Sequence, residues 1–134
     1  MNPFEFYLPL RILFGRGCLQ RGLELSARLG RRPLVVTGRR FVRATGLDTR
    51  ITAFLGEAGV SPVFYGMVPP EPRVEDVEAG ADLCRREGCD AVIAVGGGSP
   101  LDAGKAIAVL ARNSGALREY FGEEAFPCDP LPVA

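Results

Sequence analysis

The feature that most constrains this chain is a turn within residues 90–105 that connects an apolar run to a helix. The apolar run ends at Val95, and three consecutive glycines follow it: Gly96, Gly97 and Gly98. Ser99 suits the N-cap of the helix, and Pro100 suits its first position because the N–H that proline lacks would have no partner there. A buried strand that leads directly into a helix indicates an α/β fold.

The glycine turn predicts a site for a bound anion. Backbone N–H groups at the N-terminus of a helix can reach a phosphate when no side chain stands in the way. The alternative is a capped turn that binds nothing, but a single glycine would be enough to close such a turn. Three glycines therefore favour a loop that binds pyrophosphate through the backbone of residues 96–99.

Two familiar phosphate motifs do not match this loop. A P-loop would need glycine in place of Ser99 and Ser or Thr in place of Ala106. The dinucleotide fingerprint G-x-G-x-x-G would need glycine in place of Leu101, and it normally follows the first strand of its sheet. The loop therefore belongs to another kind of phosphate site.

Composition limits the classes of function. One domain fits the 134 residues, and 16 basic residues balance 16 acidic ones, which argues against a nucleic-acid or membrane surface. No apolar run approaches the length that spans a bilayer, and we find no secretory signal. The four cysteines show no Cys-x-x-Cys pairing, so we expect reduced thiols and a cytoplasmic protein. Because the sequence contains no histidine, a histidine-rich metal site or a histidine base cannot be built from it.

Apolar patterns predict strands that alternate with helices. The expected strands are residues 33–37, 60–65 and 91–95, and the expected helices are residues 19–30, 51–58, 74–88, 100–111 and 117–121. This alternation predicts a Rossmann-like parallel sheet with helices on both faces, and residues 4–17 predict an N-terminal β-hairpin. Residues 131–134 resemble the beginning of a further strand. Four aromatic residues near the N-terminus are expected in the core: Phe4, Phe6, Tyr7 and Phe14.

The run Gly-Gly-Gly-Ser-Pro-Leu-Asp-Ala-Gly-Lys at residues 96–105 resembles the signature of the iron-containing (group III, metal-dependent) alcohol dehydrogenases. Residues 4–17 resemble the opening hairpin of that family, residues 33–38 its second strand and residues 68–73 its proline loop. Dehydroquinate synthases and maleylacetate reductases share a similar glycine turn, but not the residues that follow it. The resemblance implies that residues 1–134 form the NAD(P)-binding, dehydroquinate synthase-like N-terminal domain, incomplete at its C-terminal end.

The resemblance also implies an activity for the intact enzyme. In this family a divalent metal, usually iron, is held by one aspartate and three histidines in a C-terminal all-helical domain, which we expect to be missing here. We therefore assign no catalytic and no metal-binding residue, and we expect these 134 residues alone to be inactive. The intact enzyme would transfer a hydride between a small alcohol and an aldehyde or ketone, with a nicotinamide nucleotide as partner. A face exposed by the missing domain would favour self-association as a homo-oligomer.

The helix after the glycines supplies two further candidates for cofactor binding. The resemblance places Asp102 near the nicotinamide end of the cofactor, although the same residue could serve only to stabilise the helix N-terminus. Lys105 lies three positions on, so that an ion pair with Asp102 is geometrically allowed. Together with the turn, the predicted cofactor residues in this part of the chain are Gly96, Gly97, Gly98, Ser99, Asp102 and Lys105.

Gly38, Arg39 and Arg40 are expected to select the cofactor. After the second strand of a nucleotide-binding sheet, an acidic residue typically binds the ribose 2′-hydroxyl and repels a 2′-phosphate. Many members of the resembling family have aspartate where this chain has Gly38. Glycine removes the repulsion and two guanidinium groups can hold a phosphate, so we predict NADP in preference to NAD. The alternative is a solvated basic turn.

Two other functions remain open from the sequence. One is a non-catalytic nucleotide-binding module or truncated remnant. The other is a flavodoxin-like α/β domain with no dehydrogenase ancestry. Glu71 stands where the family usually has asparagine, and a carboxylate cannot donate the hydrogen bonds of an amide, so we leave Glu71 out of the site.

Overall fold

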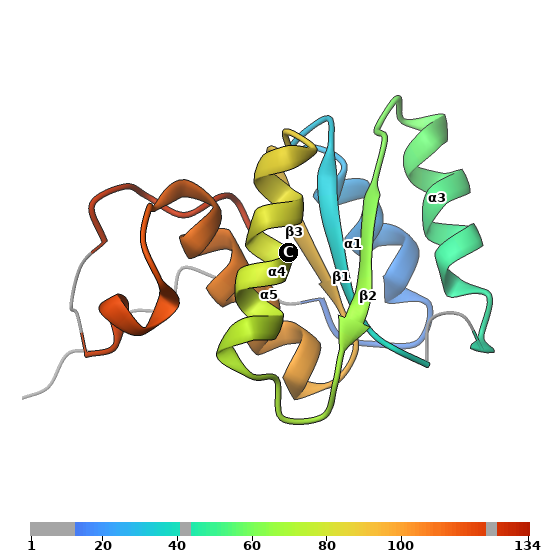
Figure 1. Ribbon diagram of the computed structural model, residues 1–134. Helices are drawn as coiled ribbons and strands as arrows, with labels where there is room; N and C mark the ends of the chain where they lie inside the picture. Colours follow the sequence, from blue (N-terminus) through green and yellow to red (C-terminus); the bar gives the residue numbers. More distant parts are fainter. Residues whose placement is uncertain (1–12, 41–43, 123–125) are drawn as a thin grey trace, which may run out of the picture.

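A three-stranded parallel sheet forms the centre of the computed structural model, which describes residues 13–40, 44–122 and 126–134 (Figure 1). The strands are β1 (Pro33–Gly38), β2 (Val63–Val68) and β3 (Ala91–Val95), and their order in the sheet is β2-β1-β3. The sheet and its parallel pairing are as predicted, and β3 has the predicted bounds.

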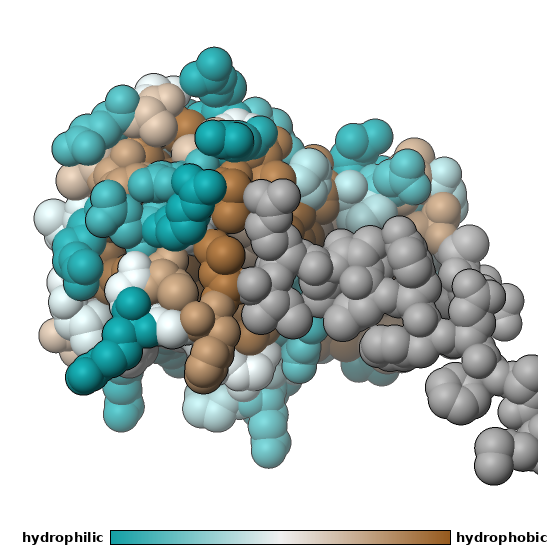
Figure 2. Space-filling view, turned by 180° about the vertical axis from the view of Figure 1, so that it is seen from behind, coloured by the Kyte–Doolittle hydropathy of each residue, from teal (hydrophilic) through white to brown (hydrophobic). Residues whose placement is uncertain are grey.

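Helices cover both faces of this sheet, as the alternating pattern predicts. Helices α1 (Cys18–Ser26) and α3 (Leu47–Glu57) lie on one face, and α4 (Val74–Arg86) and α5 (Gly98–Arg112) lie on the other (Figure 1). A short 3-10 helix, η1 (Leu117–Tyr120), follows α5. Figure 2 shows the molecule from the side opposite to Figure 1, where hydrophilic side chains cover much of the surface beside an apolar band.

Alternation along β1 divides the core into two parts. Val35 packs with Leu23 of α1 and Ile51 of α3 on one face, whereas Leu34 and Val36 pack toward α4 and α5 on the other. All three strand residues are fully buried, and burial of each such side chain contributes about 1.5–3 kcal/mol. The two-faced burial explains why this strand reads as a continuous apolar run.

The direction in which the chain builds the sheet reverses at β1. From β1 the chain moves to β2 on one side, and it then returns to place β3 on the other side. Residues 132–134 continue outward from β3: the N–H of Val92 donates to the carbonyl of Pro132 (2.8 Å), and Val133 forms a parallel bridge with Val92. This agrees with the expected strand at residues 131–134. The strand order creates a topological switch point between β1 and β3, which is where α/β sheets bind ligands at the carboxyl ends of their strands.

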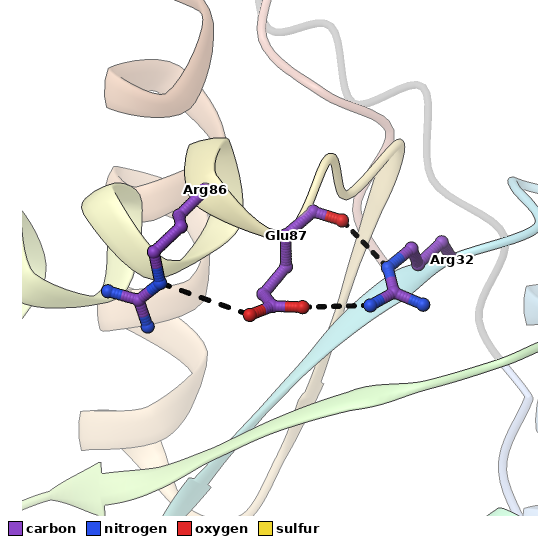
Figure 3. Close-up of polar contacts among 3 residues, drawn as sticks. All are labelled: Arg32, Arg86 and Glu87. Carbon is purple, nitrogen blue, oxygen red and sulfur yellow. Dashed lines mark hydrogen bonds and ion pairs between the residues drawn. The ribbon is translucent and has the colours of Figure 1, made fainter.

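A network of side chains holds the opposite, amino end of the sheet. The carboxylate of Asp90 accepts the backbone N–H groups of Arg31 (2.7 Å) and Arg32 (2.8 Å), which joins the start of β1 to the start of β3. The guanidinium of Arg32 donates to both the carbonyl and the carboxylate of Glu87, which also pairs with Arg86 (Figure 3). These contacts fix the lateral position of the two strands at the end away from the switch point.

Three expectations need correction or lie outside the described residues. β2 begins at Val63 instead of residue 60, because Pro62 has no N–H to donate and the ladder with β1 starts at the pair Leu34 and Val63. Phe14 is 99% exposed, so its assignment to the core is wrong. The other three aromatic residues, and most of the expected N-terminal hairpin, lie outside the described residues. Within the described ranges, no helix combines the length and the apolar character needed to cross a membrane.

Candidate functional site

A cleft of about 790 Å³ opens at the carboxyl ends of the strands, next to the switch point. Its walls come from the segments that follow β1, β2 and β3. The cleft is lined by Gly38, Arg39, Arg40, Val68, Pro69, Pro70, Gly96, Gly97, Ser99 and Pro100. Two groups of predicted residues, far apart in the sequence, thus meet in one hollow. Gly98, Asp102 and Lys105 are not among its lining residues.

The three glycines of the turn differ in what the chain itself requires of them. Gly96 has φ 151°, and a Cβ there would lie 2.7 Å from Cγ of Pro100, so only glycine fits. A Cβ at Gly97 or at Gly98 would meet nothing within 4 Å. Internal packing therefore explains the first glycine but not the other two, of which Gly97 lines the cleft and Gly98 follows it in the chain.

Helix α5 begins two residues earlier than the sequence predicts, at Gly98 instead of Pro100. Gly97 is its N-cap, no side chain caps it, and the N–H of Leu101 donates to the carbonyl of Gly97 (3.3 Å). Ser99 is therefore the second helical residue, and its assignment as N-cap is wrong because Gly97 already adopts the extended cap conformation. The amides of Gly98 and Ser99 have no acceptor within an α-helix, so the positive end of the helix is presented without a protein anion on it.

The close approach of α5 to β3 fixes the position of this helix end. Gly104 is buried, and a Cβ there would lie 2.8 Å from Cβ of Ala94. A glycine at this point lets the helix lie directly on the strand. The first turn of α5 is thereby held beside the carboxyl end of β3.

Asp102 and Lys105 form the expected ion pair, with Nζ 3.3 Å from Oδ1. The side chains are 74% and 71% exposed, respectively. An exposed pair of this kind contributes about 0–1 kcal/mol to stability. Their role toward a cofactor stays a prediction.

Arg39 is anchored across the end of the sheet. Its Nε donates to the carbonyl of Met67 in β2 (3.1 Å), while Arg39 and Arg40 both remain exposed at the cleft. The register of β1 against β2 shifts between Val36 and Gly38. A Cβ at Gly38 would lie 3.8 Å from the carbonyl oxygen of Val68, an ordinary contact, so a larger residue fits there.

The loop after β2 supplies a wall that sequence reasoning did not assign to the site. Val68, Pro69 and Pro70 line the cleft, and the resemblance to the family's proline loop was the signal that could have included them. Glu71, next to them, has φ 53° and is the only residue other than glycine with positive φ in the described segments. Backbone strain of this kind costs about 1–3 kcal/mol.

The described residues contain no group of three or more His, Cys, Asp or Glu side chains placed to hold a metal ion. The clear pKa shifts belong to Cys84 in α4, to Cys89 just after this helix and to Tyr65 in β2. Burial raises the pKa of Cys84 to about 12 and also raises the pKa of Cys89, and the two thiols contact each other. Burial likewise raises the pKa of Tyr65, whose hydroxyl donates to the carbonyl of Asp76 (2.6 Å).

A parallel sheet covered on both faces, with a glycine turn at its switch point, defines a Rossmann-like α/β domain. The family model of the iron-containing alcohol dehydrogenases matches residues 9–134. Alcohol dehydrogenase 4 of Schizosaccharomyces pombe is 34% identical over 134 residues, which are 99% of this chain and 32% of that protein. Probable NADH-dependent butanol dehydrogenase 2 of Bacillus subtilis is 35% identical over 132 residues, which are 98% of this chain and 34% of that protein.

A solved structure agrees with these sequence matches. The NADH-dependent butanol dehydrogenase A of Thermotoga maritima superposes with a TM-score of 0.87 at 28% identity, over 99% of this chain and 34% of that chain. The chain belongs to the iron-containing alcohol dehydrogenase family. It spans about a third of the length of the curated relatives it matches. The flavodoxin-like interpretation without dehydrogenase ancestry is wrong.

Proposed function

We propose that the cleft binds a nicotinamide dinucleotide as part of a metal-dependent alcohol dehydrogenase. The pyrophosphate would lie on the backbone of residues 96–99, at the N-terminus of α5. One observation carries the proposal. Gly97 lines the cleft and Gly98 follows it, and the chain's own packing needs glycine at neither position. A ligand that approaches the backbone closely is a physical reason for both.

The bound nucleotide would accept or donate the hydride that is exchanged with an alcohol, or with an aldehyde or ketone. The chain's own residues would bind the cofactor and orient it. The amides of Gly98 and Ser99 would donate to phosphate oxygens, and Pro69, Pro70 and Pro100 would form apolar walls that exclude water. The described residues do not fit the family's iron site, because no three His, Cys, Asp or Glu side chains among them are grouped to hold a metal ion.

The end of β1 supports a preference for NADP over NAD. Gly38 carries no carboxylate to repel a 2′-phosphate, and Arg39 and Arg40 line the same cleft. The names of two relatives specify NADH, so this chain would differ from them in cofactor preference. A guanidinium favours the doubly charged phosphate over a hydroxyl.

Titration of NADPH and NADH, followed by nicotinamide fluorescence, tests this preference. We expect NADPH to bind more tightly than NADH. Gly38→Asp should lower the affinity for NADPH at least tenfold, while the affinity for NADH should stay the same or rise. Gly22→Asp in α1 is the control for the added charge, since a Cβ there meets nothing within 4 Å and the site lies outside the cleft. Equal or tighter binding of NADH by the unsubstituted protein would contradict the preference.

A non-catalytic nucleotide-binding module would give the same titration, so turnover separates the two functions. We expect alcohol-dependent reduction of NADP only when the 134 residues are supplied within a chain that contains the rest of the family's length. Turnover by the 134 residues alone would contradict this. We also propose a cytoplasmic location, with Cys18, Cys84, Cys89 and Cys128 as free thiols.

A further inference from the structure

A second hollow, of about 540 Å³, lies on the α3 side of the turn that ends β1. Its walls come from the end of β1, from the first turns of α3 and from β2. It is lined by Thr37, Gly38, Arg39, Asp48, Thr49, Thr52, Ala53, Phe64 and Gly66. Gly38 and Arg39 also line the cofactor cleft, so the two hollows meet at this turn.

The polar groups of the second hollow have mixed charge. Arg39 contributes a guanidinium, and Thr49 and Thr52 contribute hydroxyls from one face of α3. Asp48 contributes a carboxylate, which is held in place because its Oδ1 accepts the N–H of Thr49 (2.9 Å). The cation and the hydroxyls suit a phosphate, while the carboxylate opposes one.

We propose that this hollow receives the group on the 2′-carbon of the adenosine ribose, and that Asp48 is a specificity-determining residue that weakens binding of a 2′-phosphate. The inference rests on the proposed function, which places the ribose beside Gly38. The 2′-phosphate of NADP would reach Arg39 and the threonine hydroxyls. Asp48 supplies, from α3, part of the repulsion that an acidic residue at the end of β1 supplies in other nucleotide-binding sheets.

The size of the effect follows from charge and distance. A phosphate and a carboxylate in one hollow of this volume are separated by roughly 5–10 Å, and solvent near the surface screens them strongly. Removal of the carboxylate charge should therefore increase the affinity for NADPH by about three- to tenfold. NADH, which carries a neutral hydroxyl at this position, should change by less than about twofold.

Asp48→Asn tests the proposal directly, because asparagine keeps an oxygen that can accept the N–H of Thr49. We expect the three- to tenfold gain for NADPH at low ionic strength, and a smaller gain in 1 M salt. Glu57→Gln is the matched control: it removes the same charge from the far end of the same helix, and it should leave both affinities unchanged. Equal shifts for NADPH and NADH, or equal effects of the two substitutions, would overturn the assignment of Asp48.

A second variant removes an attractive group. Thr52→Val deletes the hydroxyl with little change of shape and should lower the affinity for NADPH about two- to fivefold. Thr52→Ser keeps a hydroxyl and should retain the affinity. Thermal unfolding of each variant separates a loss of contact from a loss of fold. If neither nucleotide binds the unsubstituted protein, the proposed function fails. If NADPH binds but Asp48→Asn and Thr52→Val leave the ratio of affinities unchanged, only the present inference fails.

Discussion

The two ends of the same sheet are built in opposite ways. At the amino end, Asp90, Arg32 and Glu87 satisfy the backbone and one another with short hydrogen bonds. At the carboxyl end, glycines and prolines border a hollow, and the first amides of α5 have no side-chain cap. The comparison shows that polar groups are paired within the chain where strands must be held, and are left available where a ligand is expected.

The largest effect should come from Gly96→Ala. The new methyl would combine a backbone conformation that L residues avoid with a collision against the ring of Pro100, so the free energy of unfolding should fall by about 2–4 kcal/mol. Chemical denaturation measures it. Gly97→Ala is the control within the same turn and should cost no more than about 1 kcal/mol, the usual disadvantage of alanine relative to glycine at an N-cap; equal losses would remove the distinction between the glycines.

Asp90→Ala tests the amino end. Two backbone N–H groups would lose a charged acceptor, and we expect a loss of about 1–3 kcal/mol because the site is partly exposed to water. The affinity of the folded protein for nicotinamide nucleotide should not change. Asp82→Ala, which breaks an exposed pair with Arg85, is the control. A weaker cofactor affinity in Asp90→Ala would mean that the two ends are not independent.

Gly98→Ala tests the carboxyl end, where we expect affinity to fall while stability is retained. Alanine favours the helix and meets no atom within 4 Å, so stability should stay the same or rise by up to about 1 kcal/mol. Dinucleotide affinity should fall at least tenfold, which corresponds to about 1.4 kcal/mol, because the methyl lies where the phosphate would approach. Unchanged affinity, measured by nucleotide fluorescence, would argue against the backbone as the phosphate ligand.

A pH titration probes the core between the two ends. The pKa of Cys84 is about 12 in the folded protein against an ordinary value of 9.0, so the folded state binds more protons than the unfolded state between these values. The free energy of unfolding should therefore decrease as the pH rises above about 9, by up to about 1.4 kcal/mol per pH unit. Burial of Tyr65 acts in the same direction.

Cys84→Ala should flatten this dependence, whereas replacement of the exposed Cys128 by alanine should not. Denaturant unfolding at a series of pH values measures both. The same slope in the two variants would show that Cys84 is not its source.

The smallest effect is expected from the exposed pair on α5. Lys105→Ala should change the free energy of unfolding by about 0–1 kcal/mol, because both partners of the pair are largely solvated. A nucleotide titration of the same variant decides whether Lys105 also contacts the cofactor. A loss of more than about 1 kcal/mol in stability would contradict the description of this ion pair as exposed and weak.

Local signals in the sequence predicted much of the fold. The run from Ala91 to Val95 has apolar residues throughout and is bounded by Asp90 and glycine, so the strand and the turn after it were identified correctly. The sequence predicts the start of α5 two residues too late, because Ser99 is a good cap by residue type while the backbone of Gly97 already provides the cap conformation.

The parts of the site that were not predicted depend on tertiary structure. Val68 and Pro69 lie in the cleft because β2 pairs with β1, and no short-range pattern reports that pairing. Asp48 lies beside Gly38 because α3 begins at the carboxyl end of the sheet. Spacing along the sequence alone gave no reason to associate these two residues.

The absence of a side chain at Gly104 has a consequence for the glycine turn several residues away. Since no side chain separates α5 from β3 there, the interaxial distance is set by the backbone and by Ala94. A methyl group at residue 104 would tilt or lift the helix and carry its first amides away from the strand ends. The position of the amides that we propose bind phosphate thus depends partly on a buried glycine at the helix–sheet contact, and a substitution there should lower cofactor affinity as one in the glycine turn would.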